Sequence, residues 1–330
     1  MLSRDMPCTI SIIGAGRVGR TLGRRLHQLG WRMGAVVTQS AATSRKAVRA
    51  IGAGTALVLP IVPRPSNGAR KGTALAVPKR SATLRALAPE AIVFSGTLAA
   101  DVTLLAVPDG ALASVAGALA EIGGNGWRGK IVLHTSGALD RSVLAPLARR
   151  GAATGSLHPM QTFSGRATPQ LKGVIFAVEG DRKAQRAAQS IARALGGVPV
   201  PIAGSSKPAY HAAGVLVAGH ALALVEAAVQ TLLRIGFSRR RALQTLLPLI
   251  RQMLDNFERI GPRASWTGPV ARGDLSTVAR HVRALRRYPP EFQRAYAALA
   301  LLGGRVLSKT PAVTLARIAR ALKNPRGGSV

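Results

Sequence analysis

The chain has 330 residues, 47% of them apolar and only 4% aromatic, so it can bury the cores of two domains built mainly from aliphatic side chains. A single cysteine, Cys8, excludes an internal disulfide framework and a cysteine-rich zinc site, and we predict no metal. The formal net charge of +33 would attract polyanions, but the basic residues are spread along the chain without a nucleic-acid-binding motif, so we favour a solvated basic surface over a nucleic-acid partner.

The N-terminal region alternates strands and helices. A β-branched run at residues 9–13 ends at glycine and predicts a first strand, and apolar residues on one helical face predict a helix over 18–29. Residues 60–89, rich in Pro, Gly, Lys and Arg, predict an irregular basic insertion. Further strands are expected at 32–38, 101–107, 130–134, 152–157, 174–178 and 198–200, and further helices at 44–51, 111–122, up to 147, and 182–195.

From about Lys207 onward the pattern is helical only. Helical periodicity covers residues 208–235, 238–260, 275–287, 290–302 and 312–322. We therefore predict an α/β fold, with a Rossmann-type dinucleotide-binding domain over 1–203 followed by an all-α domain over 204–330.

The most membrane-like stretch is 212–229. It contains His220, Glu226 and many alanines, so we interpret it as a buried helix and predict no membrane association. The short, charged N-terminus shows no targeting signal, and together with the single cysteine this favours a cytoplasmic protein.

The loop GAGRVG, which begins at Gly14, lies between the first predicted strand and the first predicted helix. In that context it predicts a dinucleotide-binding loop. Gly14 permits the tight turn, Gly16 lets the backbone approach the pyrophosphate, and Gly19 lets helix and strand pack closely. Arg17 and Val18 open the helix whose N-terminal N–H groups would face the phosphates.

The end of the second strand indicates which dinucleotide is bound. An NAD site usually has an acidic residue there for the ribose hydroxyls. Here the strand ends at Thr38, residues 6–89 contain no Asp or Glu, and Arg45 and Lys46 follow nearby. Because hydroxyls and cations suit a 2′-phosphate, we predict NADP rather than NAD, with Arg17 adding to the preference. For either helix cation alone, a solvated helix start is an alternative.

Two further strand ends lie where open α/β sheets bind cofactors. The backbone at Val107 and Pro108 would lie along the cofactor, whereas Asp109 is better explained as a cap on the next helix. Ser136 follows the next strand in the same way. It faces the nicotinamide ribose or forms a plain Ser-Gly turn.

His158 stands at a strand end and precedes a proline. Histidine can donate a proton to a developing alkoxide or amine near neutral pH, so His158 is a candidate general acid. A structural histidine bonded to the local backbone is the alternative.

A second cluster opens the helical region. Lys207 and His211 are four residues apart and would share one helix face, with Tyr210 between them. Together they could polarise a carbonyl or an imine, or they could form an ordinary polar cap. Further along, Arg272 could clamp a substrate carboxylate, while Asp274 could cap the next helix.

These segments together resemble the bacterial Rossmann-like family whose C-terminal helical domain is domain of unknown function 2520. The HPMQTF segment from His158 and the GPVARGD segment from Gly268 carry the most specific part of the resemblance. That family is similar to pyrroline-5-carboxylate reductases and to the 6-phosphogluconate dehydrogenase superfamily. The resemblance implies an NAD(P)-dependent oxidoreductase that dimerises through its helical domain, and it implies no particular substrate.

Two features depart from the family pattern. The segment 60–89 is longer and more basic than the usual connection. Gly219-His220 stands where relatives carry an amide side chain, so His220 substitutes for that amide or the activity is altered.

We therefore predict hydride transfer to or from a C=O or C=N group of a small anionic metabolite. His158 and Lys207 would donate a proton and polarise the substrate, with His211 in support and with Tyr210 and Arg272 contacting the substrate. A non-catalytic NAD(P)-binding sensor or partner protein, and a polyanion-binding protein on the same scaffold, remain open.

Overall fold

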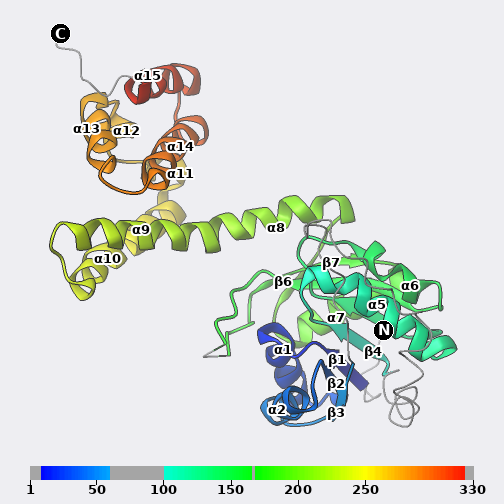
Figure 1. The fold of residues 1–330 in the computed structure, drawn as a ribbon. Helices are drawn as coiled ribbons and strands as arrows, with labels where there is room; N and C mark the ends of the chain where they lie inside the picture. Colours follow the sequence, from blue (N-terminus) through cyan, green and yellow to red (C-terminus); the bar gives the residue numbers. More distant parts are fainter. Residues whose placement is uncertain (1–8, 60–99, 166–167, 324–330) are drawn as a thin grey trace, which may run out of the picture. The chain divides into compact units, whose positions relative to one another are not determined.

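The computed structural model describes residues 9–59, 100–165 and 168–323, and its contacts divide the chain into two compact units between Ala218 and Gly219 (Figure 1). Unit 1 contains the sheet, and the described part of unit 2 is helical. The last strand ends at Pro201, close to the predicted end of the first domain, but the following helix α8 groups with unit 1. Cys8 and the predicted insertion at 60–89 lie outside the described residues.

Unit 1 is built on one eight-stranded sheet in the order β3-β2-β1-β4-β5-β6-β7-β8. Neighbouring strands pair in parallel, except β6 and β7, which run antiparallel. This doubly wound order confirms the predicted Rossmann-type α/β class. The strands are β1 Thr9–Ile13, β2 Arg32–Thr38, β3 Thr55–Val58, β4 Val102–Leu105, β5 Ile131–His134, β6 Ala153–Pro159, β7 Ile175–Gly180 and β8 Val198–Pro201.

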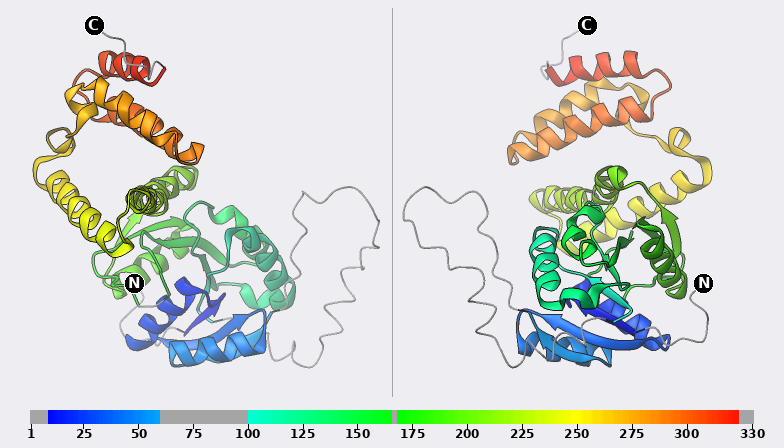
Figure 2. Two further views of the ribbon diagram at one scale, coloured as in Figure 1. Left: turned by 60° about the vertical axis from the view of Figure 1, so that its left-hand side comes forward. Right: turned by 90° about the vertical axis from the view of Figure 1, so that its right-hand side faces the viewer.

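Helices cover both faces of the sheet (Figure 2). On one face, Ile12 of β1 packs in a core with Leu22 of α1 and Ile191 of α7. On the other, Ile13 packs with Leu112 of α5, because successive strand side chains point to opposite faces. The helices of unit 1 are α1 Arg17–Gln28, α2 Ala41–Ile51, α5 Asp109–Gly123, α6 Ala145–Ala148, α7 Arg182–Ala194 and α8 Lys207–Val215.

The sequence missed strand β3, and two helices of unit 1 begin earlier than predicted: α2 at Ala41 and α5 at Asp109 instead of residue 111. Strand β3 is only partly buried and too short to show a clear alternation. Helix α2 begins at Ala41 rather than Ser44, because the side chain of Ser40 accepts a hydrogen bond from Thr43 N at 3.3 Å and caps the helix.

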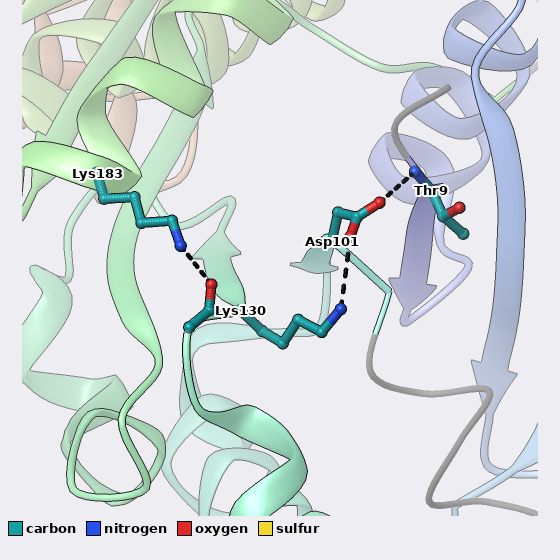
Figure 3. Close-up of polar contacts among 5 residues, drawn as sticks. Thr9, Asp101, Lys130 and Lys183 are labelled. Carbon is teal, nitrogen blue, oxygen red and sulfur yellow. Dashed lines mark hydrogen bonds and ion pairs between the residues drawn. The ribbon is translucent and has the colours of Figure 1, made fainter. Parts of the chain in front are cut away.

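Polar contacts tie the amino-terminal ends of the strands together (Figure 3). The Asp101 carboxylate, just before β4, accepts Thr9 N at 3.0 Å and lies 3.4 Å from Lys130 Nζ, just before β5. Lys183 of α7 donates to the Gly129 carbonyl on the same edge. These contacts lie on the edge opposite the carboxyl-terminal edge, where open α/β sheets bind ligands.

The boundary between the two units falls within a π-helical turn at Leu216–His220, which joins α8 to α9. The helical stretch Gly204–Arg234 is long and apolar enough to cross a membrane by length and composition. Its most apolar 18-residue segment has a mean hydropathy of 1.8, and only 6% of that segment is buried. The predicted buried helix is therefore wrong for this chain alone, because the described residues leave it uncovered. Unit 2 contains α9 Ala221–Arg234, α10 Arg239–Ile260, α11 Pro262–Ser265, α12 Pro269–Arg272, α13 Leu275–Leu285, α14 Pro290–Val306 and α15 Pro311–Lys323.

Candidate active site

The three glycines of the loop after β1 meet the geometric requirements of a pyrophosphate loop. Gly14 has φ +89°, and a Cβ there would lie 2.6 Å from the Ala106 carbonyl oxygen. A Cβ at Gly19 would collide with the Gly14 carbonyl oxygen. A Cβ at Gly16 would meet nothing within 4 Å, so its backbone faces open space. Two glycines thus permit the turn and the packing, and one leaves room for a ligand.

Helix α1 presents its N-terminus to this loop. Its cap residue Gly16 makes no side-chain capping bond, and its first turn, fully described, carries no acidic residue. The N–H groups ahead of Val18 are therefore available to an anion, which the helix dipole also favours. The exposed Arg17 donates from Nη1 to the Phe163 carbonyl at 3.4 Å, so the loop after β6 lies beside the glycine loop.

The polar residues at and after the end of β2 are of two kinds: one bonds within the protein, and the others are exposed. Thr38 Oγ1 lies 2.8 Å from Ser44 Oγ and 3.0 Å from the Ser40 carbonyl oxygen, so this hydroxyl is used within the protein. The side chains of Arg45 and Lys46 are exposed on α2. Of the residues predicted to bind a 2′-phosphate here, Thr38 is engaged within the protein, and Arg45 and Lys46 form no ion pair with any described residue.

The strand end at β4 contradicts one expectation. Helix α5 begins at Asp109 itself, with Pro108 as its cap residue and no side-chain capping bond. Asp109 is therefore not the cap; its carboxylate stands in the first turn, where the helix dipole favours a negative charge. Val107 and Pro108 lie at the carboxyl-terminal edge, beside the glycine loop.

The turn after β5 is held by a buried histidine. Ser136 N donates to His134 Nδ1 at 3.2 Å, so His134 Nε2 carries the proton and donates to the Asp140 carbonyl at 3.2 Å. Burial lowers the pKa of His134 to about 3. The Ser136 hydroxyl accepts Ala138 N and Leu139 N at 3.1 and 3.0 Å. These contacts favour the plain turn over a ribose contact for the Ser136 side chain.

Lys207 is fully buried behind this turn. Its Nζ donates to the Ser136 carbonyl and to Ser156 Oγ, both at 2.9 Å. Ser156 Oγ lies 3.4 Å from a carboxylate oxygen of Glu179, which also accepts Arg141 N at 3.0 Å. Burial lowers the pKa of Lys207 to about 8, with Glu179 opposing the shift. Lys207 thus anchors α8 to the sheet and offers a ligand no open surface.

Glu179 was not predicted from the sequence. It stands in β7 opposite Ser156 of β6 and is buried, and burial raises its pKa. The signal was present, because an acidic residue in the apolar run IFAVEG, in a chain with 13 acidic residues, implies a buried partner.

The anchor brings three predicted residues together around Gly137. The His158 ring lies 5.6 Å, centroid to centroid, from both Tyr210 and His211, edge-on to each. A Cβ on Gly137 would lie 2.7 Å from His158 Nε2 and 2.6 Å from His211 Cδ2. Only glycine therefore lets the turn after β5 approach both imidazoles.

Two buried polar atoms in this cluster lack a partner among the described residues: His158 Nδ1 and Tyr210 Oη. Burial raises the pKa of Tyr210. Burial, followed by the charges of Lys207 and His211, lowers the pKa of His158 to about 4. At neutral pH His158 is therefore an uncharged imidazole, which can donate or accept a hydrogen bond but holds no extra proton.

Arg272 and His220 lie in unit 2. Arg272 is exposed at the end of α12, and Gly273 after it has φ +72°. Asp274 caps α13 by accepting Thr277 N at 3.0 Å, which settles its role in favour of the cap. His220 is exposed in the π-helical turn.

Comparisons with known families match two stretches of the chain, and the glycine loop at residues 14–19 lies outside both. Residues 72–159 match the Rossmann-like domain, and residues 174–302 match the Domain of unknown function (DUF2520). The Rossmann-like match therefore precedes the DUF2520 match along the chain. The resemblance inferred from the motifs is confirmed. No curated protein matches the sequence.

Solved structures share the fold of this Rossmann-like and DUF2520 chain at low identity. A Bacteroides fragilis protein, provisionally described as an NADP oxidoreductase, is 20% identical with TM-score 0.66, over 89% of this chain and 96% of its own. A Streptomyces aurantiacus imine reductase is 13% identical with TM-score 0.59, over 93% and 98%. A Coxiella burnetii pyrroline-5-carboxylate reductase is 14% identical with TM-score 0.50, over 97% and 98%.

Proposed function

We propose that this protein is an NADP-dependent oxidoreductase that transfers a hydride to or from the C=O or C=N carbon of a small anionic metabolite. The observation that carries the proposal is the glycine loop, where an open Gly16 backbone meets an uncapped helix N-terminus. That arrangement binds a pyrophosphate, and the exposed Arg45 and Lys46 suit a 2′-phosphate.

The order of the strands gives the direction in which the dinucleotide would lie. The ends of β1, β4, β5 and β6 follow one another along the carboxyl-terminal edge. A dinucleotide held by its pyrophosphate at β1 would extend past Val107 toward Gly137 and His158. When bound, the nicotinamide supplies the hydride chemistry.

The chain's own residues would orient the substrate and supply a hydrogen bond. His158 is uncharged at neutral pH, so in this proposal its Nε2, which faces Gly137, hydrogen-bonds the substrate oxygen or nitrogen. Lys207 acts as a positioning residue, since its bonds to the Ser136 carbonyl and Ser156 fix the turn and α8. His211 and Tyr210 then form the remaining walls of the site.

The names of two structural neighbours support C=N chemistry as the first to test. One is an imine reductase and one is a pyrroline-5-carboxylate reductase, and both share this fold. Cyclic imine acids are therefore the first substrates to screen, followed by oxo acids.

The decisive experiment is a titration of the purified full chain with NADPH and with NADH, followed by nicotinamide fluorescence at fixed salt. Micromolar binding that favours NADPH supports the proposal. Binding that favours NADH would overturn the NADP assignment. No binding of either would overturn the oxidoreductase, and NADPH binding without turnover on any imine or oxo acid would favour a sensor.

We also propose that a second copy of the chain covers the apolar helices of unit 2. Leu254 and Phe257 of α10 are more than half exposed, and Leu222 of α9 is 69% exposed. The same two helices carry the exposed Arg239–Glu226 ion pair at 2.8 Å, which suits a protein partner better than lipid. Size-exclusion chromatography with light scattering should give a dimer, and L254E/F257E a monomer; a wild-type monomer would contradict this.

A further inference from the structure

A hollow in unit 2 is lined by cations and by no acidic residue. Its volume is about 330 Å³, and its walls come from α11, α12, α13, the turn after α14, and α15. The cations are Arg263, Arg272, Lys309 and Arg317. All lie within unit 2, so the hollow does not depend on how the two units are placed.

None of these four cations forms an ion pair with any residue that the structure describes. All four side chains are exposed at the rim. Asp274 lies in the chain between two residues that line the hollow, but its carboxylate caps α13 and accepts hydrogen bonds from Thr277 N and Ser276 Oγ. Four like charges that face one space repel one another, and a bound anion would relieve that repulsion.

Contacts within the protein fix the shape of the hollow. Ser308 is buried; its hydroxyl accepts Thr310 N at 3.0 Å and lies 2.8 Å from Thr314 Oγ1, which fixes the turn before α15. Arg317 Nη2 lies 3.4 Å from the Gly273 carbonyl, so its guanidinium is held over the hollow. Trp266 supplies one apolar wall.

We infer that this hollow is a binding site for a phosphate-bearing small molecule. Three guanidiniums match the oxygens of a phosphate by paired hydrogen bonds, and a dianion needs several cations at once. The volume accommodates a small organic phosphate, with Trp266 against its carbon skeleton. This site is separate from the proposed oxidoreductase activity, and neither proposal depends on the other.

The test uses the full chain without nicotinamide cofactor and titrates inorganic phosphate at constant ionic strength, with citrate in a parallel titration. Calorimetry and the fluorescence of Trp266 report binding, and W266F should abolish the fluorescence change. K309Q/R317Q should weaken phosphate binding at least tenfold. The matched control R186Q/R193Q removes the same charge from exposed positions of α7 in unit 1 and should change binding less than twofold.

Three outcomes would overturn the inference. One is an equal loss in both double variants, which would indicate a general charge effect. Another is undiminished binding in K309Q/R317Q, which would place the phosphate elsewhere, for example at the glycine loop. The third is tighter binding of citrate than of phosphate, which would assign the hollow to carboxylates. Loss of NADPH binding in the glycine-loop variant G16A, with phosphate binding retained, separates this site from the proposed function.

Discussion

Lys207 Nζ and the Ser136 carbonyl oxygen are 2.9 Å apart, although 71 positions separate the two residues in the chain. This bond ties the first turn of α8 to the loop after β5. Because Tyr210 and His211 follow on α8, and Gly137 follows Ser136, the same bond places both rings beside His158. The buried Lys207 ammonium therefore positions the two rings beside His158 without being in contact with them.

Replacing Lys207 by methionine should destabilise unit 1. The change nearly keeps the side-chain length but leaves the Ser136 carbonyl and Ser156 without the Lys207 donor, and it removes the positive charge near the buried Glu179. The expected cost is about 2–3 kcal/mol in the free energy of unfolding. Urea unfolding followed by circular dichroism measures it. Lys46→Met, at an exposed position, is the control. Equal midpoints for the two variants would show that the anchor contributes nothing.

Stability should fall as the pH drops below 6.5. The folded-state pKa values of His134 and His158 are about 3 and about 4, below the unfolded value of 6.5, so between these values the unfolded chain binds more protons. Each histidine then removes about 1.4 kcal/mol of unfolding free energy per pH unit. Glu179, whose pKa is raised, acts in the opposite direction and offsets only part of this.

The check is the slope of unfolding free energy against pH between 6.5 and 4.5, from denaturant titrations. His158→Asn should reduce the slope by about 1.4 kcal/mol per pH unit, which corresponds to one bound proton. His220→Asn, at an exposed position, should leave the slope as in the wild type. A wild-type slope in the His158→Asn variant would refute the buried neutral histidine.

Alanine substitutions at two glycines of the loop should have different effects, one on NADPH binding and one on stability. Gly16→Ala adds a methyl group in open space, so the chain should keep its melting temperature while NADPH binding weakens at least tenfold. Gly19→Ala places the methyl group against the Gly14 carbonyl oxygen and should lower stability by about 1–3 kcal/mol. Thermal melts and NADPH titrations of both variants separate the effects. Normal NADPH binding by Gly16→Ala would contradict the pyrophosphate loop.

The 2′-phosphate assignment can be tested on one helix. Arg45→Gln should weaken NADPH binding about 5- to 30-fold, the effect of one charge-assisted hydrogen bond, and leave NADH binding unchanged. Arg49→Gln, one turn further along α2 and also exposed, is the matched control. If the two variants lose NADPH affinity equally, the effect is long-range charge rather than contact.

His158→Ala should lower turnover at least tenfold on any substrate found by the screen, with NADPH affinity within twofold of the wild type. The imidazole contacts Gly137, Tyr210 and His211 rather than the glycine loop, so cofactor binding does not depend on it. Steady-state kinetics beside a fluorescence titration measure both quantities. Unchanged turnover would remove His158 from the mechanism.

Short-range patterns in the sequence were sufficient for most of the fold. The glycine loop, the alternation of strands and helices, and the change to helices alone predicted the α/β class, and β1 and β2 have the predicted bounds. The position of His158 at a strand end likewise pointed to the carboxyl-terminal edge. These features depend on local periodicity and turn chemistry, which one sequence contains.

What the sequence did not contain were contacts between distant residues. Nothing local shows that Lys207 reaches Ser136 or that Glu179 faces Ser156, so the buried anchor was mistaken for a group open to substrate. The burial of residues 212–229 was mispredicted for the same reason. Hydropathy shows that a helix is apolar, but it does not show whether another part of the protein packs against it.

The reversed direction of β7 affects how this fold can diversify. A parallel strand would send the chain to the opposite rim before it returned, but β7 re-enters the sheet on the rim where β6 leaves it. The connection begins with the exposed Gln161 and Thr162 and includes Phe163 beside Arg17, whereas Leu171 near its end is buried in the core. Its first part can therefore change without altering a strand register. Related chains can therefore vary the surroundings of His158 in this part of the connection while the sheet beneath it stays the same.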